Sequence, residues 1–165
     1  MSALIQCQFD YACSSWYYGL TKKSKSRLQV AQNKVIRFML NLPPRAHIGA
    51  EQFQMVGMLP VEYRVEQLQV NHMFNIQHGH ALEYLKAQFQ TSLASHNTRN
   101  SIASFYVPRV NGFGKNSFKF TGVKNWNRLP IEIKSIVSKN IFKQHVKKHL
   151  MSRVLFNDQS NFIYY

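Results

Sequence analysis

Residues 60–79, PVEYRVEQLQVNHMFNIQHG, form the stretch that decides the fold. Proline is favoured at the beginning of a helix and glycine just beyond its end, so Pro60 and Gly79 predict the limits of one long helix. Apolar side chains recur at helical spacing on two of its faces. One face carries Val61, Val65, Leu68, His72 and Ile76, and the other carries Tyr63, Val70 and Phe74. We therefore expect a central helix that packs on two sides.

The segments before this helix show the same periodicity. One helix is expected over 4–16, and another over 22–40 with Thr21 as its N-cap. A short helix is expected over 49–56. The predicted apolar stripe of the helix over 22–40 consists of Leu28, Ala31, Val35 and Met39.

The segments after the central helix are predicted as follows. Residues 81–89 and 117–127 are expected to be helical, and a last helix begins after Ser138. Residues 91–116 are rich in Ser, Asn and Gly, which is typical of a loop, and a loop of this length is usually functional or partly disordered. The apolar stripe of the last helix consists of Ile141, Phe142, Val146 and Leu150.

These segments together predict a mainly α fold. We expect a small helical domain of five to seven helices, with a long loop and at most a short strand pair around Phe105 and Phe120. The predicted division is a helical segment at 1–90, a long loop at 91–116, a C-terminal helical segment at 117–156 and a tail at 157–165.

The chain is strongly basic. It has 165 residues with 21 Lys and Arg but only 7 Asp and Glu, a formal net charge of +14. Residues 81–165 hold 13 basic and 3 acidic side chains, a net charge of +10. This excess indicates a nucleic acid, an anionic membrane surface or an acidic protein as the partner. No apolar run approaches the length of a membrane span, so no segment is expected to cross a membrane. Among these partners we favour a nucleic acid and expect no membrane.

The basic residues of the last helix have no acidic neighbours. No Asp or Glu interrupts residues 134–153, whereas a solvated helix face usually mixes both signs. The pattern favours phosphate binding by charge neutralisation without base readout over an ordinary solvated surface. The candidate contacts are Arg99, Lys115, Lys119, Lys124, Arg128, Lys139, Lys143, Lys147 and Lys148, together with Arg27, Lys34 and Arg37 of the helix over 22–40.

The motif WNRLP at 126–130 has a structural and a functional interpretation. Trp126 can stack on a base, or it can pack in the core, where Gly122 would let the indole approach closely. We favour the core, with Leu129 buried as well and Phe142 in contact. Asn127 is expected to cap the turn that Pro130 opens.

The motif HNTR at 96–99 lies in the long loop and carries no apolar anchor. Its Asn and Thr side chains can bond the loop backbone, and Arg99 can contact a phosphate. Both interpretations stay open.

The sequence offers no catalytic or metal site. Two-metal phosphoryl transfer needs clustered carboxylates, and this chain has no acidic pair. His145 and His149 share a helix face but lack a third ligand nearby, and His78 and His80 flank a helix end. His72 is expected to be a hydrogen-bonded core residue. We therefore predict no catalysis, no metal and no cofactor.

Several phrases occur in an order that resembles one protein family. They are FDYACSSW at 9–16, Leu28-Gln29, Gln32-Asn33-Lys34 with Arg37, HNTR at 96–99, GKNSF at 114–118, WNRLP at 126–130, and Phe142 in the last helix. Together they are similar to the C-terminal region of reverse transcriptases from non-LTR retrotransposons of the LINE-like or jockey-like type. The resemblance covers residues 3–153.

The resemblance implies a region that follows the fingers and palm of the polymerase, with residues 1–90 corresponding to a thumb-like segment. The family's palm holds its metal ions with two adjacent aspartates. The aspartates here are Asp10 and Asp158, far apart in sequence. The resemblance thus implies descent from an RNA-directed DNA polymerase without polymerase activity in this chain, and it makes the rest of a reverse transcriptase a candidate partner.

Two classes of function are compatible with these observations. The first is a non-catalytic module that binds RNA or DNA through its phosphates. The second is a structural or protein-interaction fragment, including a degraded retroelement remnant without selected activity. The two cysteines, Cys7 and Cys13, exclude a disulfide framework and favour an intracellular chain, nuclear or cytoplasmic. The sequence does not specify an oligomeric state or a choice between RNA and DNA.

Overall fold

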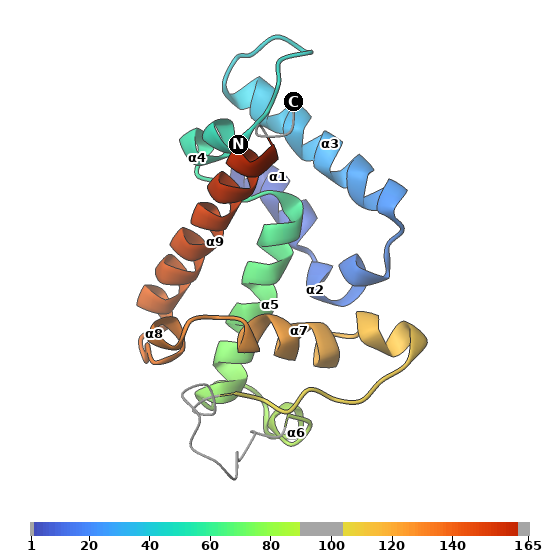
Figure 1. Ribbon diagram of the computed structural model, residues 1–165, viewed down its shortest axis with the longest axis vertical. Helices are drawn as coiled ribbons and strands as arrows, with labels where there is room; N and C mark the ends of the chain where they lie inside the picture. Colours follow the sequence, from blue (N-terminus) through green and yellow to red (C-terminus); the bar gives the residue numbers. More distant parts are fainter. Residues whose placement is uncertain (1, 90–103, 162–165) are drawn as a thin grey trace.

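Helix α5 (Val61–Gln77) lies at the centre of the molecule (Figure 1). The structure is a computed structural model that describes residues 2–89 and 104–161. Pro60 precedes α5, and Gly79 follows it with a φ of 77°, a left-handed conformation that glycine adopts without strain. The helices in contact with α5 include α1 (Ser2–Asp10), α2 (Cys13–Trp16), α3 (Lys22–Met39), α6 (Glu83–Lys86), α7 (Phe118–Asn127) and α9 (Lys139–Asn161).

The fold is mainly α, as predicted. The described residues form nine α-helices, of which α2, α6 and α8 (Ile131–Lys134) are single turns of four residues. The other six helices, which include α4 (Ala50–Val56), agree with the predicted five to seven. Two short 3-10 helices, η1 (Tyr17–Gly19) and η2 (Gly112–Asn116), complete the described elements. Phe120 is helical and Phe105 forms only an isolated β-bridge, so the described parts of the chain contain no strand pair at these positions.

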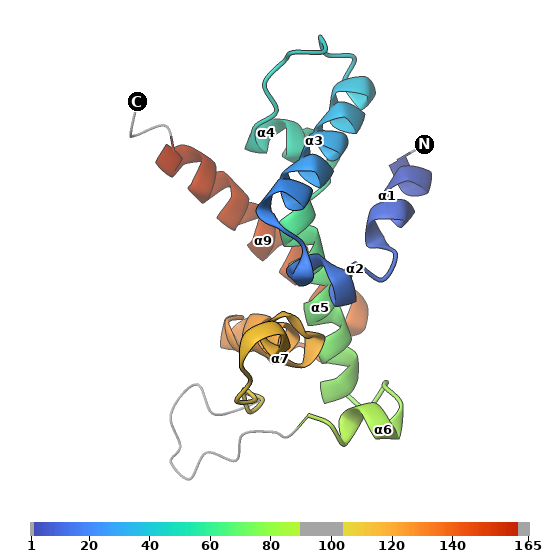
Figure 2. The ribbon, with the colours of Figure 1, turned by 90° about the vertical axis from the view of Figure 1, so that its right-hand side faces the viewer.

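Two long helices pack on α5 in different directions. Helix α9 crosses α5 obliquely (Figure 2), whereas α7 lies across it in the view of Figure 1. Figure 2 shows α1 and α9 on opposite sides of α5. Helices α1 and α9 therefore pack against different sides of the central helix.

The largest apolar core combines side chains from both halves of the chain. Phe74 of α5, Trp126 of α7 and Phe142 of α9 are fully buried. The ring centroids of Phe74 and Phe142 are 4.3 Å apart, and those of Trp126 and Phe142 are 5.8 Å apart. Leu129 is buried in the same cluster. The core interpretation of Trp126 and Leu129 is confirmed.

One expectation for the residues around Trp126 is wrong. The side chain of Asn127 does not cap the turn at Pro130 but bonds the backbone N and O of Phe105, at 3.0 Å and 2.8 Å. A Cβ atom on Gly122 would lie 2.8 Å from the ring of Phe118, so this glycine makes room for that phenyl ring.

The helix expected over 4–16 is interrupted at Ala12. This residue has a φ of 48° and separates α1 from α2. The change of direction lets Cys13 and Tyr17 pack against Val61 and Val65 of α5, where all four side chains are buried. Hydrophobic periodicity cannot reveal a break at a single alanine.

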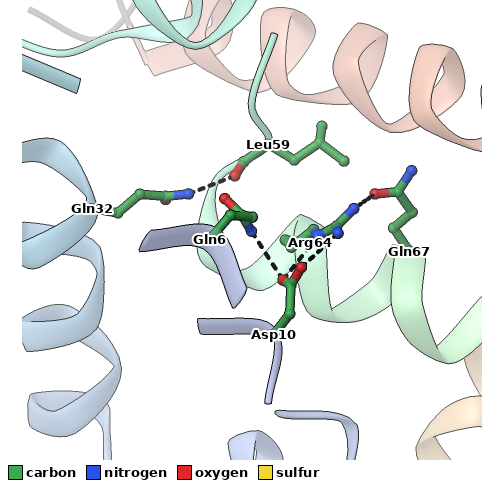
Figure 3. Close-up of polar contacts among 6 residues, drawn as sticks. All are labelled: Gln6, Asp10, Gln32, Leu59, Arg64 and Gln67. Atoms are coloured by element: carbon green, nitrogen blue, oxygen red, sulfur yellow. Dashed lines mark hydrogen bonds and ion pairs between the residues drawn. The ribbon is translucent and has the colours of Figure 1, made fainter. Parts of the chain in front are cut away.

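The apolar stripe predicted for α3 is also wrong. Ala31 and Met39 are exposed, whereas Gln32 and Ile36 are buried. The Gln32 Nε2 atom donates a hydrogen bond of 2.9 Å to the carbonyl oxygen of Leu59 (Figure 3). The buried side of α3 thus contains a glutamine whose side chain bonds the backbone, whereas the sequence pattern predicted only apolar side chains there.

The N-terminus of α3 agrees with the prediction from the sequence, whereas the C-terminus of α9 differs from it. The hydroxyl of Thr21 accepts a hydrogen bond from the backbone N of Ser24 at 3.3 Å, so the predicted cap of α3 is confirmed. Helix α9 continues to Asn161, beyond the boundary expected at residue 156.

A bidentate ion pair ties α1 to α5. The Nε and Nη2 atoms of Arg64 donate to the two carboxylate oxygens of Asp10 at 3.0 Å and 2.7 Å (Figure 3). Gln6 also donates to Asp10, at 2.9 Å, and Arg64 donates to Gln67 at 2.6 Å. Asp10 is therefore committed to a structural contact.

We expect Trp126→Ala to lower the free energy of unfolding by about 3–5 kcal/mol, because truncating a buried aromatic side chain leaves a cavity. Chemical denaturation measures the change, and Phe113→Ala is the control because the Phe113 side chain is 92% exposed. A Trp126→Ala protein as stable as this control would contradict the core interpretation.

Candidate nucleic-acid interface

A polar pocket of about 440 Å³ lies beside α7. Its walls come from η1, α5, η2, α7 and α9, so it unites segments that are far apart in the sequence. Its charged lining consists of Lys115, Lys124, Arg128, Arg153, Glu62 and Glu66. The other lining residues are Tyr18, Tyr63, Phe120, Thr121, Asn125 and Asn157. We call this cavity the α7 pocket.

Three of the cations predicted from the sequence meet at the α7 pocket. Lys115, Lys124 and Arg128 are all exposed there. The described residues form two ion pairs, Arg64–Asp10 and Arg153–Glu66, and neither involves these three cations. Their positive charge is therefore available to an anion from solution.

Arg153 also lines the α7 pocket, although it was not among the phosphate contacts predicted from the sequence. Its Nη1 atom donates to Glu66 Oε1 at 2.6 Å, and its guanidinium lies 5.5 Å from the ring centroid of Tyr63. Asn157 donates to the Tyr63 hydroxyl at 2.7 Å. These contacts hold α9 against α5 and fix one wall of the pocket. The sequence signal was the end of the acid-free run at Arg153.

A buried hydrogen-bond network forms the floor of the α7 pocket. Gln69 of α5 is fully buried, and its Nε2 atom donates to the Ser14 carbonyl at 3.1 Å and to the Thr121 hydroxyl at 2.9 Å. Its Oε1 atom accepts from Asn125 Nδ2 at 2.9 Å, and Asn125 also donates to the Tyr18 hydroxyl at 3.0 Å. This network joins α2, η1 and α7 to the central helix.

Five other predicted cations are exposed but do not line the α7 pocket. Lys147 lies close to the end of α4, because a Cβ atom on Gly57 would be 3.8 Å from its Nζ atom. The five are Lys119 of α7 and Lys139, Lys143, Lys147 and Lys148 of α9.

One lysine of the acid-free run is not available to a ligand. The Lys134 residue is only 6% exposed, and its Nζ atom donates to the Asn127 carbonyl at 3.1 Å. Burial lowers the pKa of Lys134. This residue supports the turn after α7 and adds nothing to the basic surface.

The predicted basic stripe of α3 is separate from the pocket. Arg27 and Lys34 are exposed, whereas Arg37 is half-buried and donates from Nε to the Ala46 carbonyl at 2.8 Å. Arg37 thus holds the segment that leads from α3 to α4. Arg99 and the motif HNTR at 96–99 lie outside the described residues.

The histidines singled out as metal candidates do not gather into a site. His145 is exposed, and His149 is half-buried with a pKa that burial lowers. The His78 ring packs 4.1 Å from the ring of Phe74. In residues 2–89 and 104–161, no group of three or more His, Cys, Asp or Glu side chains is placed to hold a metal ion.

His72 is not the core residue that the sequence predicts. It is exposed and lies edge-on to Phe118, with the ring centroids 6.0 Å apart. Partial burial, with the charge of Lys139, lowers the pKa of His72.

Comparisons with protein families, with curated proteins and with solved structures found no match to this chain. Within the described ranges, no helix combines the length and the apolar character needed to cross a membrane.

Gln69→Leu should lower the free energy of unfolding by about 2–4 kcal/mol, because each buried polar group left without a partner costs about 1–3 kcal/mol. Thermal and chemical denaturation measure this, with the exposed Gln54→Leu as the control. The network would not be essential to the fold if both variants unfolded at the same denaturant concentration.

Proposed function

We propose that this domain is a non-catalytic module that binds RNA or DNA through its phosphate groups. The observation that carries the proposal is the α7 pocket, where Lys115, Lys124 and Arg128 converge without a carboxylate partner among the described residues. A chain with a net charge of +14 that leaves three cations unpaired around one cavity is suited to a polyanion.

Exposed lysines of α9 add further positive charge outside the pocket. Lys139, Lys143, Lys147 and Lys148 each supply a flexible cation, which suits phosphate oxygens better than base edges. Each phosphate neutralised releases condensed counterions, so binding should weaken steeply as the salt concentration rises.

The resemblance to non-LTR reverse transcriptases gives this proposal a biological context. In it, the domain is the C-terminal, post-palm part of an RNA-directed DNA polymerase and acts inside the cell, in the nucleus or the cytoplasm. The ordered sequence phrases support this origin. Asp10, which bonds Arg64, is unsuited to the paired-aspartate metal site of the family's palm. Binding without catalysis is consistent with that chemistry.

We expect simultaneous replacement of Lys143, Lys147 and Lys148 by Gln to reduce the slope of log binding constant against log salt concentration. The magnitude of the slope should fall by about 2 to 3, because each phosphate contact contributes about 0.7–0.9 to it. Fluorescence anisotropy with a labelled single-stranded 20-mer, titrated at several salt concentrations, measures the slope. The buried stripe of Phe142, Val146 and Leu150 is untouched, so the circular dichroism spectrum should not change.

The matched control removes the same charge from exposed positions outside the proposed surface, with Lys22, Lys23 and Arg45 replaced by Gln. It should change the slope far less. The proposal is wrong if the wild-type protein binds neither RNA nor DNA at low salt, because the positive charge would then serve an acidic protein partner or solubility.

A further inference from the structure

We propose that the α7 pocket binds the terminal phosphate monoester of a single-stranded nucleic acid. This inference rests on the proposed function and deepens it: the exposed α9 lysines hold internal phosphates, whereas the pocket selects a chain end. Three features of the pocket carry it, namely its charge, its size and the chemistry of its floor.

The charge of the pocket matches a phosphate dianion. Its four cationic and two acidic side chains give a net charge of +2. Since Glu66 is engaged by Arg153 at 2.6 Å, Lys115, Lys124 and Arg128 face only one other acid, Glu62. A phosphate monoester carries about −1.5 to −2 at neutral pH, and an internal phosphodiester carries only −1. The monoester therefore neutralises the pocket more completely.

The size of the pocket suits a small group rather than a long stretch of strand. Side chains from η1, α5, η2, α7 and α9 surround it, and its volume of about 440 Å³ lies in the range of cavities that take a small ligand. A terminal phosphate with its nucleoside is a group of the size that such a cavity takes.

The floor of the pocket supplies a donor and an aromatic ring. The Tyr18 hydroxyl accepts a hydrogen bond from Asn125 at 3.0 Å, which leaves its own proton to donate to a phosphate oxygen. Burial raises the pKa of Tyr18, so the hydroxyl remains protonated at neutral pH. The half-buried Phe120 ring, with Lys124 Nζ 5.8 Å from its centroid, offers the attached nucleoside a surface for stacking.

The test compares one single-stranded 12-mer in three forms, with a 5′-phosphate, with a 3′-phosphate, and with hydroxyls at both ends. The probe is labelled internally, and affinity is measured by fluorescence anisotropy at neutral pH. We expect one phosphorylated form to bind about tenfold more tightly than the dihydroxyl form, as one or two additional charge-assisted hydrogen bonds would give. Which form gains affinity identifies the end that the pocket holds.

Variants locate the effect in the pocket. Replacing Lys124 and Arg128 together by Gln should abolish the preference for the terminal phosphate. Replacing Lys143 and Lys147 by Gln removes the same charge from α9, and it should weaken all three forms alike while the preference persists. Lys115→Gln, in the exposed η2 segment, tests the pocket independently and should reduce the preference if the double variant does not fold.

The outcomes separate this inference from the proposed function. Equal, salt-dependent affinity for all three forms overturns the terminal-phosphate site and leaves the proposed function standing. Loss of the preference in the α9 variant, with retention in the Lys124/Arg128 variant, overturns it as well. Absence of binding to every form overturns both.

Discussion

The buried side chain of Gln69 is the constraint on which the rest of the structure depends. It sits in the middle of α5 and bonds Ser14, Thr121 and Asn125, so one amide fixes the N-terminal helices and α7 relative to the central helix. A polar group in a protein interior is favourable only when its hydrogen bonds are made, which permits one crossing position for α7. The same bonds form the floor of the α7 pocket. The contacts that define the fold thereby bring the exposed cations to one cavity.

The sequence predicts the parts of this fold that follow from apolar periodicity and from caps. The central helix, the Thr21 cap of α3 and the burial of Trp126 all agree with prediction. Periodicity does not reveal buried polar contacts, and it does not reveal a helix break that depends on one backbone dihedral angle. The buried Gln32 of α3 bonds the backbone of Leu59, between α4 and α5, and Ala12 adopts a left-handed conformation that is uncommon for a residue with a Cβ atom. Both depend on tertiary partners that are remote in sequence.

The charge of the candidate site could be predicted from the sequence, but its shape could not. Composition identified Lys115, Lys124 and Arg128, because residues 81–165 carry 13 basic and only 3 acidic side chains. The sequence does not show that Arg153 reaches the same cavity from α9, since its position depends on the bond to Glu66 of α5. Nor does it distinguish the buried Lys134 from the exposed lysines around it. The packing of α7 against α5 and α9 determines which cations make structural contacts and which are available to a ligand.

Chemical-shift mapping tests the central claim most directly. The ¹⁵N-labelled protein is titrated with a single-stranded 12-mer that carries a terminal phosphate, and the backbone and side-chain amides are followed. We expect the largest changes over residues 115–128, including the side-chain amide of Asn125, with smaller changes along α9. Changes confined to α4 and α6, or no change at low salt, would contradict it.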